Sequence, residues 1–317
     1  MIMKKKNLIL AATAAAMIAA MTGCSGGAEE TTAAETTAAE TTAAETEAEE
    51  TEAEETAQTE EPAAQETENS AENVELVVFA AASMTETLTE ISEMYASVAP
   101  NVTLTFNFDS SGTLKTQIQE GADCDLFISA GQKQMNQLDI NADPEVNTEG
   151  LDFVDEASRV DILENKVTLC VNDDNTAGLE SFDDMAAALQ DGSILMAMGN
   201  SDVPVGQYTQ KILAYYELDE EELAGSGVIS YGSNVKEVTT QIKEGSVDCG
   251  VIYCTDAYSD ELNIVDYATA EMCGQVIYPA AVLKTAAHPA EAQAFLDYLQ
   301  TDECMAVFEA VGFSGVE

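Results

Sequence analysis

The stretch that decides the fold is residues 74–131, which read VELVVFAAASMTETLTEISEMYASVAPNVTLTFNFDSSGTLKTQIQEGADCDLFISAG. It contains the same pattern twice, in which an apolar strand runs into a turn of small residues and then into a helix. Val74–Ala80 is the first predicted strand, and Thr103–Phe108 is the second. Because each helix begins where its strand ends, two helix N-termini with free backbone N–H groups are expected to face one crevice. Such a crevice is suited to an anion.

Serine residues stand at both predicted helix starts. Ser83 precedes a helix whose apolar residues recur at three- and four-residue spacing, and Glu86 follows it at the spacing of a capping box. We therefore expect Ser83 to cap this helix. Ser110 and Ser111 stand in the turn before the second helix. Taken singly, a capping serine or a Ser-Ser-Gly turn needs no ligand, so these residues alone do not establish a binding site.

The second half of the chain repeats the order of strand, turn and helix. A predicted strand at 193–199 is followed by NSDVPVG at 200–206, which breaks the chain before a helix. GSNV at 232–235 precedes another helix, with Asn234 at the capping position. GVIY at 250–253 is a strand that ends in tyrosine. Each of these features alone is an ordinary helix entry or a half-buried strand residue.

Five segments resemble motifs of the molybdate-binding protein family (ModA) of ABC transporters. They occur in the family's order over almost all of residues 74–312, and they are AAAS (80–83), SSGTLKTQI (110–118), VPVG (203–206), GSNV (232–235) and GVIY (250–253). GADCDLFISA (121–130) resembles a further segment of the family. The sequence departs from the family's pattern at Asp123 and Cys124, which replace Pro and Ala and are not ligand positions in the family. Val205 replaces an Ala, and its larger side chain could narrow the pocket.

The resemblance implies a ligand site made of hydrogen-bond donors. In this family, the positions of Ser83, Ser111 and Tyr253 supply side-chain hydroxyl groups. The positions of Val205 and Val235 supply backbone N–H groups. A tetrahedral oxyanion such as molybdate carries no proton at neutral pH, so donors are all that it needs.

The resemblance also implies the fold and the function. The fold is α/β, a two-lobed type II periplasmic-binding-protein fold in which each lobe is a doubly wound mixed sheet flanked by helices. Lobe one is expected to comprise residues 74–162 and 268–317, and lobe two residues 163–267. Crossing strands near Asp161–Val167 and Ala268–Tyr278 would form the hinge. The protein would capture molybdate, and also tungstate, between the lobes and deliver it to the membrane permease and ATPase of an ABC importer.

Other functions remain open at this point. A receptor for sulfate or another tetrahedral oxyanion would share the fold and differ in pocket size. A phosphate receptor would need an acceptor for the ligand's proton, and Asp109 is adjacent to the predicted site. An enzyme that used Ser83 or Ser111 as a nucleophile would need a base, and the only histidine, His288, lies outside the predicted site. A surface adhesin is a further alternative. We expect no catalytic residue, no cofactor and no metal beyond the bound molybdate.

The N-terminal segment is typical of an exported lipoprotein. Residues 1–23 combine three lysines with an apolar core too short for a permanent membrane span, and they precede Cys24 in a sequence that resembles a lipobox. We expect cleavage before Cys24, lipid on its thiol, and a position on the extracytoplasmic face of the cell membrane. A plain secretory signal is the alternative. Residues 24–73 repeat TTAAE, contain no aromatic or basic residue, and are predicted to form an extended acidic tether.

The composition restricts the possible partners. The chain has 59 acidic and 11 basic residues and a formal net charge of −48, so nucleic acid is not an expected partner. We expect a monomer. Six cysteines follow Cys24, and this even number is consistent both with disulfides and with buried free thiols.

Overall fold

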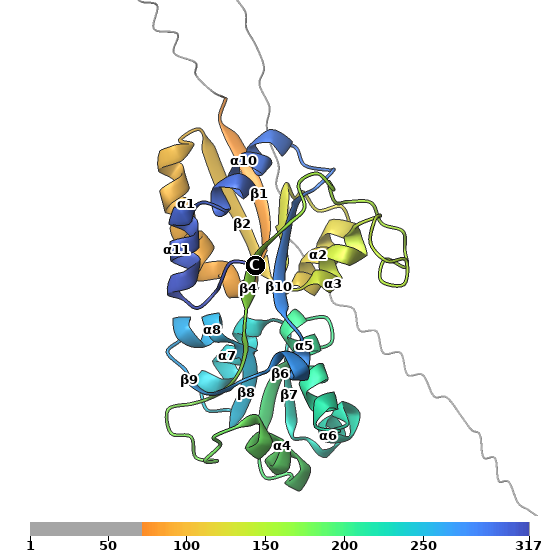
Figure 1. The fold of residues 1–317 in the computed structure, drawn as a ribbon, viewed down its shortest axis with the longest axis vertical. Coiled ribbons are helices and arrows are strands. Elements are labelled where there is room, and N and C mark those ends of the chain that lie inside the picture. Colours follow the sequence, from red (N-terminus) through yellow and green to blue (C-terminus); the bar gives the residue numbers. More distant parts are fainter. Residues whose placement is uncertain (1–71, 317) are drawn as a thin grey trace, which may run out of the picture. The chain divides into compact units, whose positions relative to one another are not determined.

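The structure is a computed structural model that describes residues 72–316 (Figure 1). The predicted signal peptide, the predicted lipid anchor at Cys24 and all but the last two residues of the predicted tether lie outside the described residues. The described part is an α/β protein with two five-stranded sheets, each flanked by helices, as the sequence predicts (Figure 1). Within residues 72–316, no helix combines the length and the apolar character that a membrane span requires.

The first sheet has the strand order β2-β1-β3-β10-β4. Its strands are β1 (Val74–Ala81), β2 (Val102–Asp109), β3 (Leu126–Ile128), β4 (Val160–Asn165) and β10 (Val276–Val282). β1 pairs in parallel with β2 and β3, whereas β10 pairs antiparallel with β3 and β4. The carboxyl ends of β1, β2 and β3 therefore meet at one edge of the sheet, where a ligand site of an α/β protein is expected.

The helices around this sheet come from both ends of the described chain. They are the 3₁₀ turn η1 (Ala82–Met84), α1 (Thr85–Val98), α2 (Ser111–Gln119), α3 (Gln132–Leu138), α10 (Pro289–Leu299) and α11 (Asp302–Ala310). In α1, the buried residues Leu88, Ile91 and Tyr95 share one face because they are three or four positions apart. The ring of Tyr95 packs against Phe295 of α10, with 4.9 Å between the ring centroids, so the C-terminal helices belong to the first sheet.

The second sheet has the order β7-β6-β8-β5-β9. Its strands are β5 (Val167–Val171), β6 (Met196–Gly199), β7 (Ile229–Gly232), β8 (Cys249–Tyr253) and β9 (Asn263–Tyr267). Its helices are α4 (Phe182–Asp191), α5 (Pro204–Tyr215), α6 (Glu220–Ser226), α7 (Val235–Lys243), α8 (Cys254–Ser259) and α9 (Ala270–Cys273). Every residue of β5, β6 and β8 is buried, as expected for strands covered on both faces.

We call the first sheet with its helices the first lobe, and the second sheet with its helices the second lobe. The chain passes between them at Lys166, which lies between β4 and β5, and returns from β9 through α9 to β10. β4 and β10 pair with each other, and Figure 1 shows them side by side where the chain passes between the lobes. The predicted boundary after residue 162 falls within β4, which continues to Asn165.

The apolar core extends through both lobes. One cluster of buried residues includes Leu76 and Val78 of β1 together with Leu169 and Val251 of the second lobe. A smaller cluster around Phe127 covers the face of the first sheet toward α2 and α3. The six cysteines that follow Cys24 are all free and buried in the described part of the chain, so the free-thiol interpretation is the one that the structure bears out.

The predicted cap of the first helix is wrong. Ser83 lies within η1, α1 begins at Thr85, and Met84 occupies the N-cap position without a side-chain hydrogen bond. The Ser83 hydroxyl instead forms a buried hydrogen bond with the hydroxyl of Tyr278 on β10, with 2.8 Å between the oxygens. The Ser83 side chain is directed toward this distant strand and makes no capping bond to its own helix, so a tertiary contact has overridden the local signal.

Candidate functional site

The five residues predicted to form the site line one small cavity between the two lobes. The volume of the cavity is about 10 Å³, which is room for about one water molecule. The walls come from the ends of strands and the starts of helices in both lobes. The lining residues are Ala81, Ala82, Ser83, Asp109, Ser110, Ser111, Ala130, Val203, Pro204, Val205, Val235 and Tyr253.

Ser111 is the first residue of α2, and a neighbouring strand end orients its hydroxyl. Ser110 caps the helix by accepting a hydrogen bond from the Thr113 N–H at 3.2 Å. Ser111 Oγ accepts a hydrogen bond from the Ala130 N–H at 2.9 Å. A backbone N–H can only donate, so the proton of Ser111 is left free for another acceptor. Ser111 is fully buried and lines the cavity, so it can offer this proton there.

The backbone of α2 comes very close to the second lobe at Gly112. A Cβ atom at this position would lie 2.1 Å from the carbonyl oxygen of Asp202, in the loop before α5. Any residue other than glycine would therefore clash with the backbone of the opposite lobe. The glycine of the Ser-Ser-Gly sequence therefore allows the N-terminus of α2, with its donors, to lie against the second lobe.

Val205 and Val235 lie at the N-termini of two helices of the second lobe. Val205 is the second residue of α5, which begins with Pro204. Val235 is the first residue of α7, and the predicted cap of this helix is confirmed, because Asn234 accepts a hydrogen bond from the Glu237 N–H at 3.0 Å. Backbone N–H groups in the first turn have no acceptor within their own helix. The N-termini of both helices therefore present backbone N–H donors and the positive end of the helix dipole at the cavity wall.

Tyr253 ends β8 and is the residue that points most directly to a ligand. It is 1% exposed, and its Oη is buried without a hydrogen-bond partner among the described residues. Burial raises the pKa of Tyr253 well above its ordinary value, so the hydroxyl keeps its proton at neutral pH. A buried polar group without a partner costs about 1–3 kcal/mol, and a bound acceptor would remove this cost.

Asp109 is the acidic side chain in the cavity wall, and donors from both lobes hold it. Its Oδ1 accepts a hydrogen bond from the Ser110 N–H at 2.7 Å. The same atom accepts a hydrogen bond from Asn234 Nδ2 of the second lobe at 3.2 Å. The Asn234 contact connects the lobes directly beside the cavity. Oδ1 of Asp109 is therefore engaged by donors of the protein.

A second carboxyl group, Asp256 of α8, is fully buried close to the site and was not predicted to belong to it. Its pKa is raised to about 7, mainly because burial disfavours the charged form, although Lys236 lowers it. Lys236 Nζ lies 3.3 Å from Asp256 Oδ1 and 2.8 Å from Glu86 Oε1 of the first lobe. The charge of Lys236 is thus already balanced by carboxyl groups of both lobes.

The sequence did not indicate two buried residues near Ser83, of which one contacts it directly and the other contacts it through the first. Tyr278 of β10 bonds Ser83, and Asn165 at the end of β4 donates to Tyr278 Oη at 3.0 Å. The available signal was a single polar-tipped aromatic residue within the apolar strand VIYPAAV. Such a residue usually has a buried partner, but the sequence does not indicate which one.

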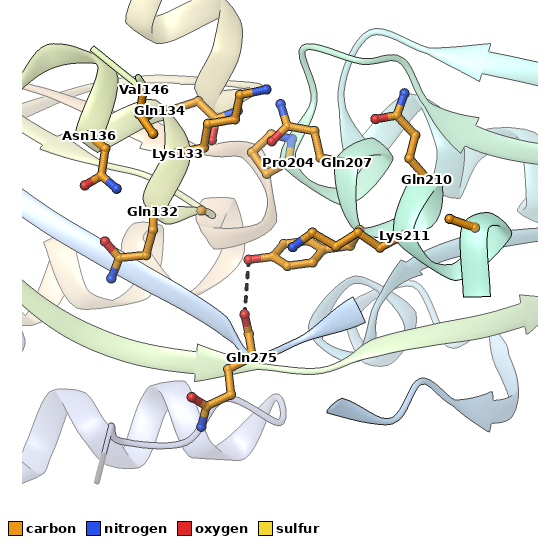
Figure 2. A pocket seen from close by; sticks show the side chains of 13 residues that line it. Gln132, Lys133, Gln134, Asn136, Val146, Pro204, Gln207, Gln210, Lys211 and Gln275 are labelled. Atoms are coloured by element: carbon orange, nitrogen blue, oxygen red, sulfur yellow. Dashed lines mark hydrogen bonds between the residues drawn. The ribbon is translucent and has the colours of Figure 1, made fainter. Parts of the chain in front are cut away.

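A larger open cleft of about 590 Å³ lies beside α3 and α5, and amide side chains and two lysines line much of it (Figure 2). It contains none of the five predicted site residues. Figure 2 shows Gln275, whose carbonyl accepts a hydrogen bond from Tyr208 Oη at 3.4 Å. Lys211 Nζ donates to the Cys273 carbonyl at 3.2 Å. Tyr208 and Lys211 of α5 thus bond the backbone of residues 273 and 275.

Comparison with known proteins identifies the family. Residues 76–314 match the family described as bacterial extracellular solute-binding protein. YvgL of Bacillus subtilis, whose name as an ABC transporter substrate-binding lipoprotein is provisional, is 32% identical over 252 residues, which cover 79% of this chain and 90% of YvgL. The molybdate-binding protein ModA of Haemophilus influenzae is 30% identical over 250 residues, which cover 77% of this chain and 91% of that protein.

Solved structures show the same fold. The periplasmic molybdate-binding protein of Azotobacter vinelandii matches 76% of this chain and 100% of its own, with a TM-score of 0.64 and 21% identity. The sulfate-binding protein SubI of Mycobacterium tuberculosis matches 77% of this chain and 88% of its own, with a TM-score of 0.61 and 16% identity. Proteins of this family are extracytoplasmic solute-binding proteins and not enzymes. This chain therefore belongs to the bacterial extracellular solute-binding proteins, as a ModA-like substrate-binding protein of ABC transporters.

Proposed function

We propose that this protein captures molybdate, and also tungstate, between its two lobes and delivers the anion to the permease and ATPase of an ABC importer. The proposed contacts are the hydroxyl groups of Ser83, Ser111 and Tyr253 and the backbone N–H groups of Val205 and Val235. The observation that carries the proposal is the hydroxyl of Tyr253, which lies at the wall of the cavity, is buried, and has no partner among the described residues.

The donor set suits an oxyanion that carries no proton. Ser111 accepts a backbone hydrogen bond and retains its own proton, and the phenol of Tyr253 stays protonated at neutral pH. Asp109 is the one acidic residue of the cavity lining, and its Oδ1 already accepts two hydrogen bonds. Phosphate, which keeps a proton at neutral pH, would meet a lining made mostly of donors, in which the second oxygen of Asp109 is the carboxylate acceptor that remains.

Dipoles rather than cations would balance the charge of the ligand. The chain has a net charge of −48, and Lys236 is paired with Glu86 and Asp256. The N-termini of α2, α5 and α7 supply positive dipole ends from both lobes. Exposed acidic groups farther away are screened over about 10 Å at ordinary salt concentrations. Hydrogen bonds to a charged group contribute roughly 1.5–3 kcal/mol each, so a few of them suffice for tight binding.

The proposal extends to the location of the protein. The mature chain would begin at Cys24, carry lipid on that thiol, and hold its folded part as a monomer above the extracytoplasmic face of the membrane by residues 24–73. Support comes from the basic and apolar segments of residues 1–23 and from the relative YvgL, whose name includes lipoprotein.

Isothermal titration and thermal unfolding of the purified protein test the ligand. Molybdate, tungstate, sulfate and phosphate are compared at equal concentration. We expect binding heat and stabilisation with molybdate and tungstate and no response to phosphate. The stabilisation is large enough to detect, because a ligand at 100 times its Kd stabilises by roughly 2.7 kcal/mol. A response to sulfate alone would overturn the choice of ligand. No response to any of the four anions would overturn the proposed function.

A further inference from the structure

We propose that Tyr278 is a positioning residue that forces Ser83 to act as a hydrogen-bond donor toward the anion. Tyr278 does not line the cavity and acts through a buried chain of side chains, which we call the Ser83–Tyr278–Asn165 chain. The inference rests on the proposed function, because it concerns the site that would bind the oxyanion. It adds to that site a residue that selects ligands by their protonation state.

The amide of Asn165 sets the direction of this chain. Its Oδ1 accepts a hydrogen bond from the Lys166 N–H at 2.8 Å, and a backbone N–H can only donate. This contact fixes which end of the amide carries the nitrogen. Nδ2 is therefore directed to Tyr278 Oη, at 3.0 Å, and also to Thr255 Oγ1, at 3.0 Å. Both contacts of Nδ2 are donated, so Tyr278 receives a hydrogen bond from Asn165.

The remaining hydrogen bond of Tyr278 has only one possible direction. Tyr278 is fully buried, and burial raises its pKa well above the ordinary value, so it carries a proton that needs an acceptor. Within residues 72–316, the contacts of its Oη are Asn165 Nδ2, which is a donor, and Ser83 Oγ at 2.8 Å. The proton of Tyr278 therefore goes to Ser83 Oγ. Ser83 then has its own proton left to donate, and it lines the cavity.

The position of Tyr278 is fixed by its surroundings. Its ring packs against those of Tyr253 and Phe313, with 6.0 Å and 5.2 Å between centroids. It lies on β10 opposite Leu163 of β4, where the pairing shifts register before Pro279. Tyr278 and Asn165 thus lie on the two strands next to the lobe connections, and Ser83 meets them from η1. The partners of this chain come from both lobes. This support holds Tyr278 Oη against Ser83 Oγ, which accepts its proton and keeps its own proton for the anion.

The consequence is selectivity for oxyanions without a proton. Because Tyr278 donates to its oxygen, Ser83 has its own proton free for the ligand and one lone pair left, so it acts toward the ligand chiefly as a donor. Ser111 is in the same condition, because its oxygen accepts the Ala130 N–H. Both serines therefore present a proton to the anion, which favours molybdate, an anion that only accepts, over phosphate, which also has a proton to donate.

The test is a double-mutant cycle on the full protein, with affinities measured by isothermal titration for molybdate and for inorganic phosphate. Tyr278→Phe removes the hydroxyl and keeps the ring. We expect molybdate affinity to fall about three- to tenfold, the equivalent of one ordinary hydrogen bond. The ratio of molybdate to phosphate affinity is expected to fall as well, because Ser83 regains the freedom to accept. In a Ser83→Ala background, Tyr278→Phe is expected to cause no further loss.

Tyr208→Phe is the matched control, because Tyr208 is also buried and packs against Tyr253, at 6.4 Å between centroids, but its hydroxyl bonds the Gln275 carbonyl. We expect near wild-type affinity. Asn165→Asp is a second variant, in which an acceptor replaces the donor and Tyr278 can donate away from Ser83; molybdate affinity should fall as in Tyr278→Phe. Thermal unfolding without anion checks that each variant is folded.

The outcomes separate this inference from the proposed function. Equal losses from Tyr278→Phe with and without Ser83, or an unchanged affinity in Tyr278→Phe, would overturn the inference while the protein remains an oxyanion receptor. If the wild-type protein binds sulfate instead of molybdate, the same cycle is measured with sulfate. Failure of the wild-type protein to bind any of these anions would overturn the proposed function, and this inference with it.

Discussion

Lys236 on α7 pairs with Glu86 on α1, so an ion pair connects the two lobes, with 2.8 Å between Nζ and Oε1. The same ammonium lies 3.3 Å from the buried Asp256, which has no other charged partner within this distance among the described ion pairs. Burial acts to lower the pKa of Lys236, but Asp256 and Glu86 raise it by more, so the lysine is charged at all ordinary pH values. The titration of Asp256 therefore decides the net charge of this group.

The stability of the protein should depend on pH through Asp256. Its pKa in the folded protein is about 7, against an ordinary value of 3.8, because burial disfavours the carboxylate. The folded state thus binds this proton more tightly than the unfolded state. The resulting stabilisation is complete below about pH 4 and is lost as the pH rises through about 7.

Asp256→Asn should remove this dependence. The free energy of unfolding of the wild-type protein, relative to that of the variant, should fall between pH 4 and pH 8 by up to about 4 kcal/mol, the equivalent of a pKa rise from 3.8 to about 7. Urea denaturation without anion, at one-unit intervals of pH, measures the difference. Parallel profiles for the two proteins would show that Asp256 titrates normally.

Replacement of Lys236 should lower the free energy of unfolding more at high pH than at low pH. Lys236→Gln leaves Asp256 buried without its cation, and we expect a loss of about 1–3 kcal/mol of unfolding free energy at pH 8. At pH 5 the loss should be smaller, because Asp256 is then protonated in the folded state. Lys243→Gln is the control, since Lys243 pairs with Asp260 at 2.9 Å on the surface and such pairs contribute about 0–1 kcal/mol. An equal loss at both pH values would contradict the role given to Asp256.

The hydroxyl of Tyr253 should act in opposite directions on stability and on binding. It is buried without a partner among the described residues, so Tyr253→Phe should leave the anion-free protein as stable as the wild type or more stable. Molybdate affinity should fall by about 1–3 kcal/mol, because one ligand oxygen loses its donor. Titration and urea denaturation of the same preparation measure both quantities.

Tyr258→Phe serves as the control for this substitution, because Tyr258 is 63% exposed and its hydroxyl is not in the cavity. Unchanged affinity in Tyr253→Phe would mean that this hydroxyl does not contact the anion. A loss of stability comparable with the loss of affinity would mean that the hydroxyl has a structural partner after all.

Local patterns in the sequence predicted those elements whose structure depends on local interactions. Helix α7 begins at Val235, directly after the predicted cap Asn234, because Asn234 accepts a local hydrogen bond from the Glu237 N–H. Strand β1 ends at Ala81, one residue beyond the prediction. The short elements β7, β9 and α9 were not predicted, since they carry little periodicity and are set by their neighbours in the second lobe.

The site was predictable only in part, for a physical reason. The motifs named five ligand positions, and these residues line one cavity; their contacts with an anion remain a proposal. The capping spacing at Ser83 indicated a local bond, whereas the hydroxyl bonds Tyr278, 195 positions away in the chain. The pattern around Ser83 contains no information on a contact at such a separation. The raised pKa of Asp256 likewise depends on burial, which only the fold determines.

The close approach of Gly112 to the second lobe gives the sharpest test of closure of the lobes around the ligand. A Cβ at this position would lie 2.1 Å from the Asp202 carbonyl oxygen. Neither atom can turn away, because the oxygen is backbone and the position of a Cβ is fixed by its own backbone. Gly112→Ala should therefore hold the lobes apart and weaken molybdate binding by tenfold or more. The fold within each lobe should be kept, because alanine is a better helix former than glycine and Gly112 lies in α2.

Gly225→Ala is the matched control, since Gly225 is also helical, in α6, and a Cβ there would meet nothing within 4 Å. Its affinity should equal that of the wild type. Small-angle scattering with and without molybdate provides the second measurement, because wild-type protein should contract on binding and Gly112→Ala should contract less. Wild-type affinity in Gly112→Ala would mean that the anion is bound without this backbone contact, and the proposed closure would then be wrong.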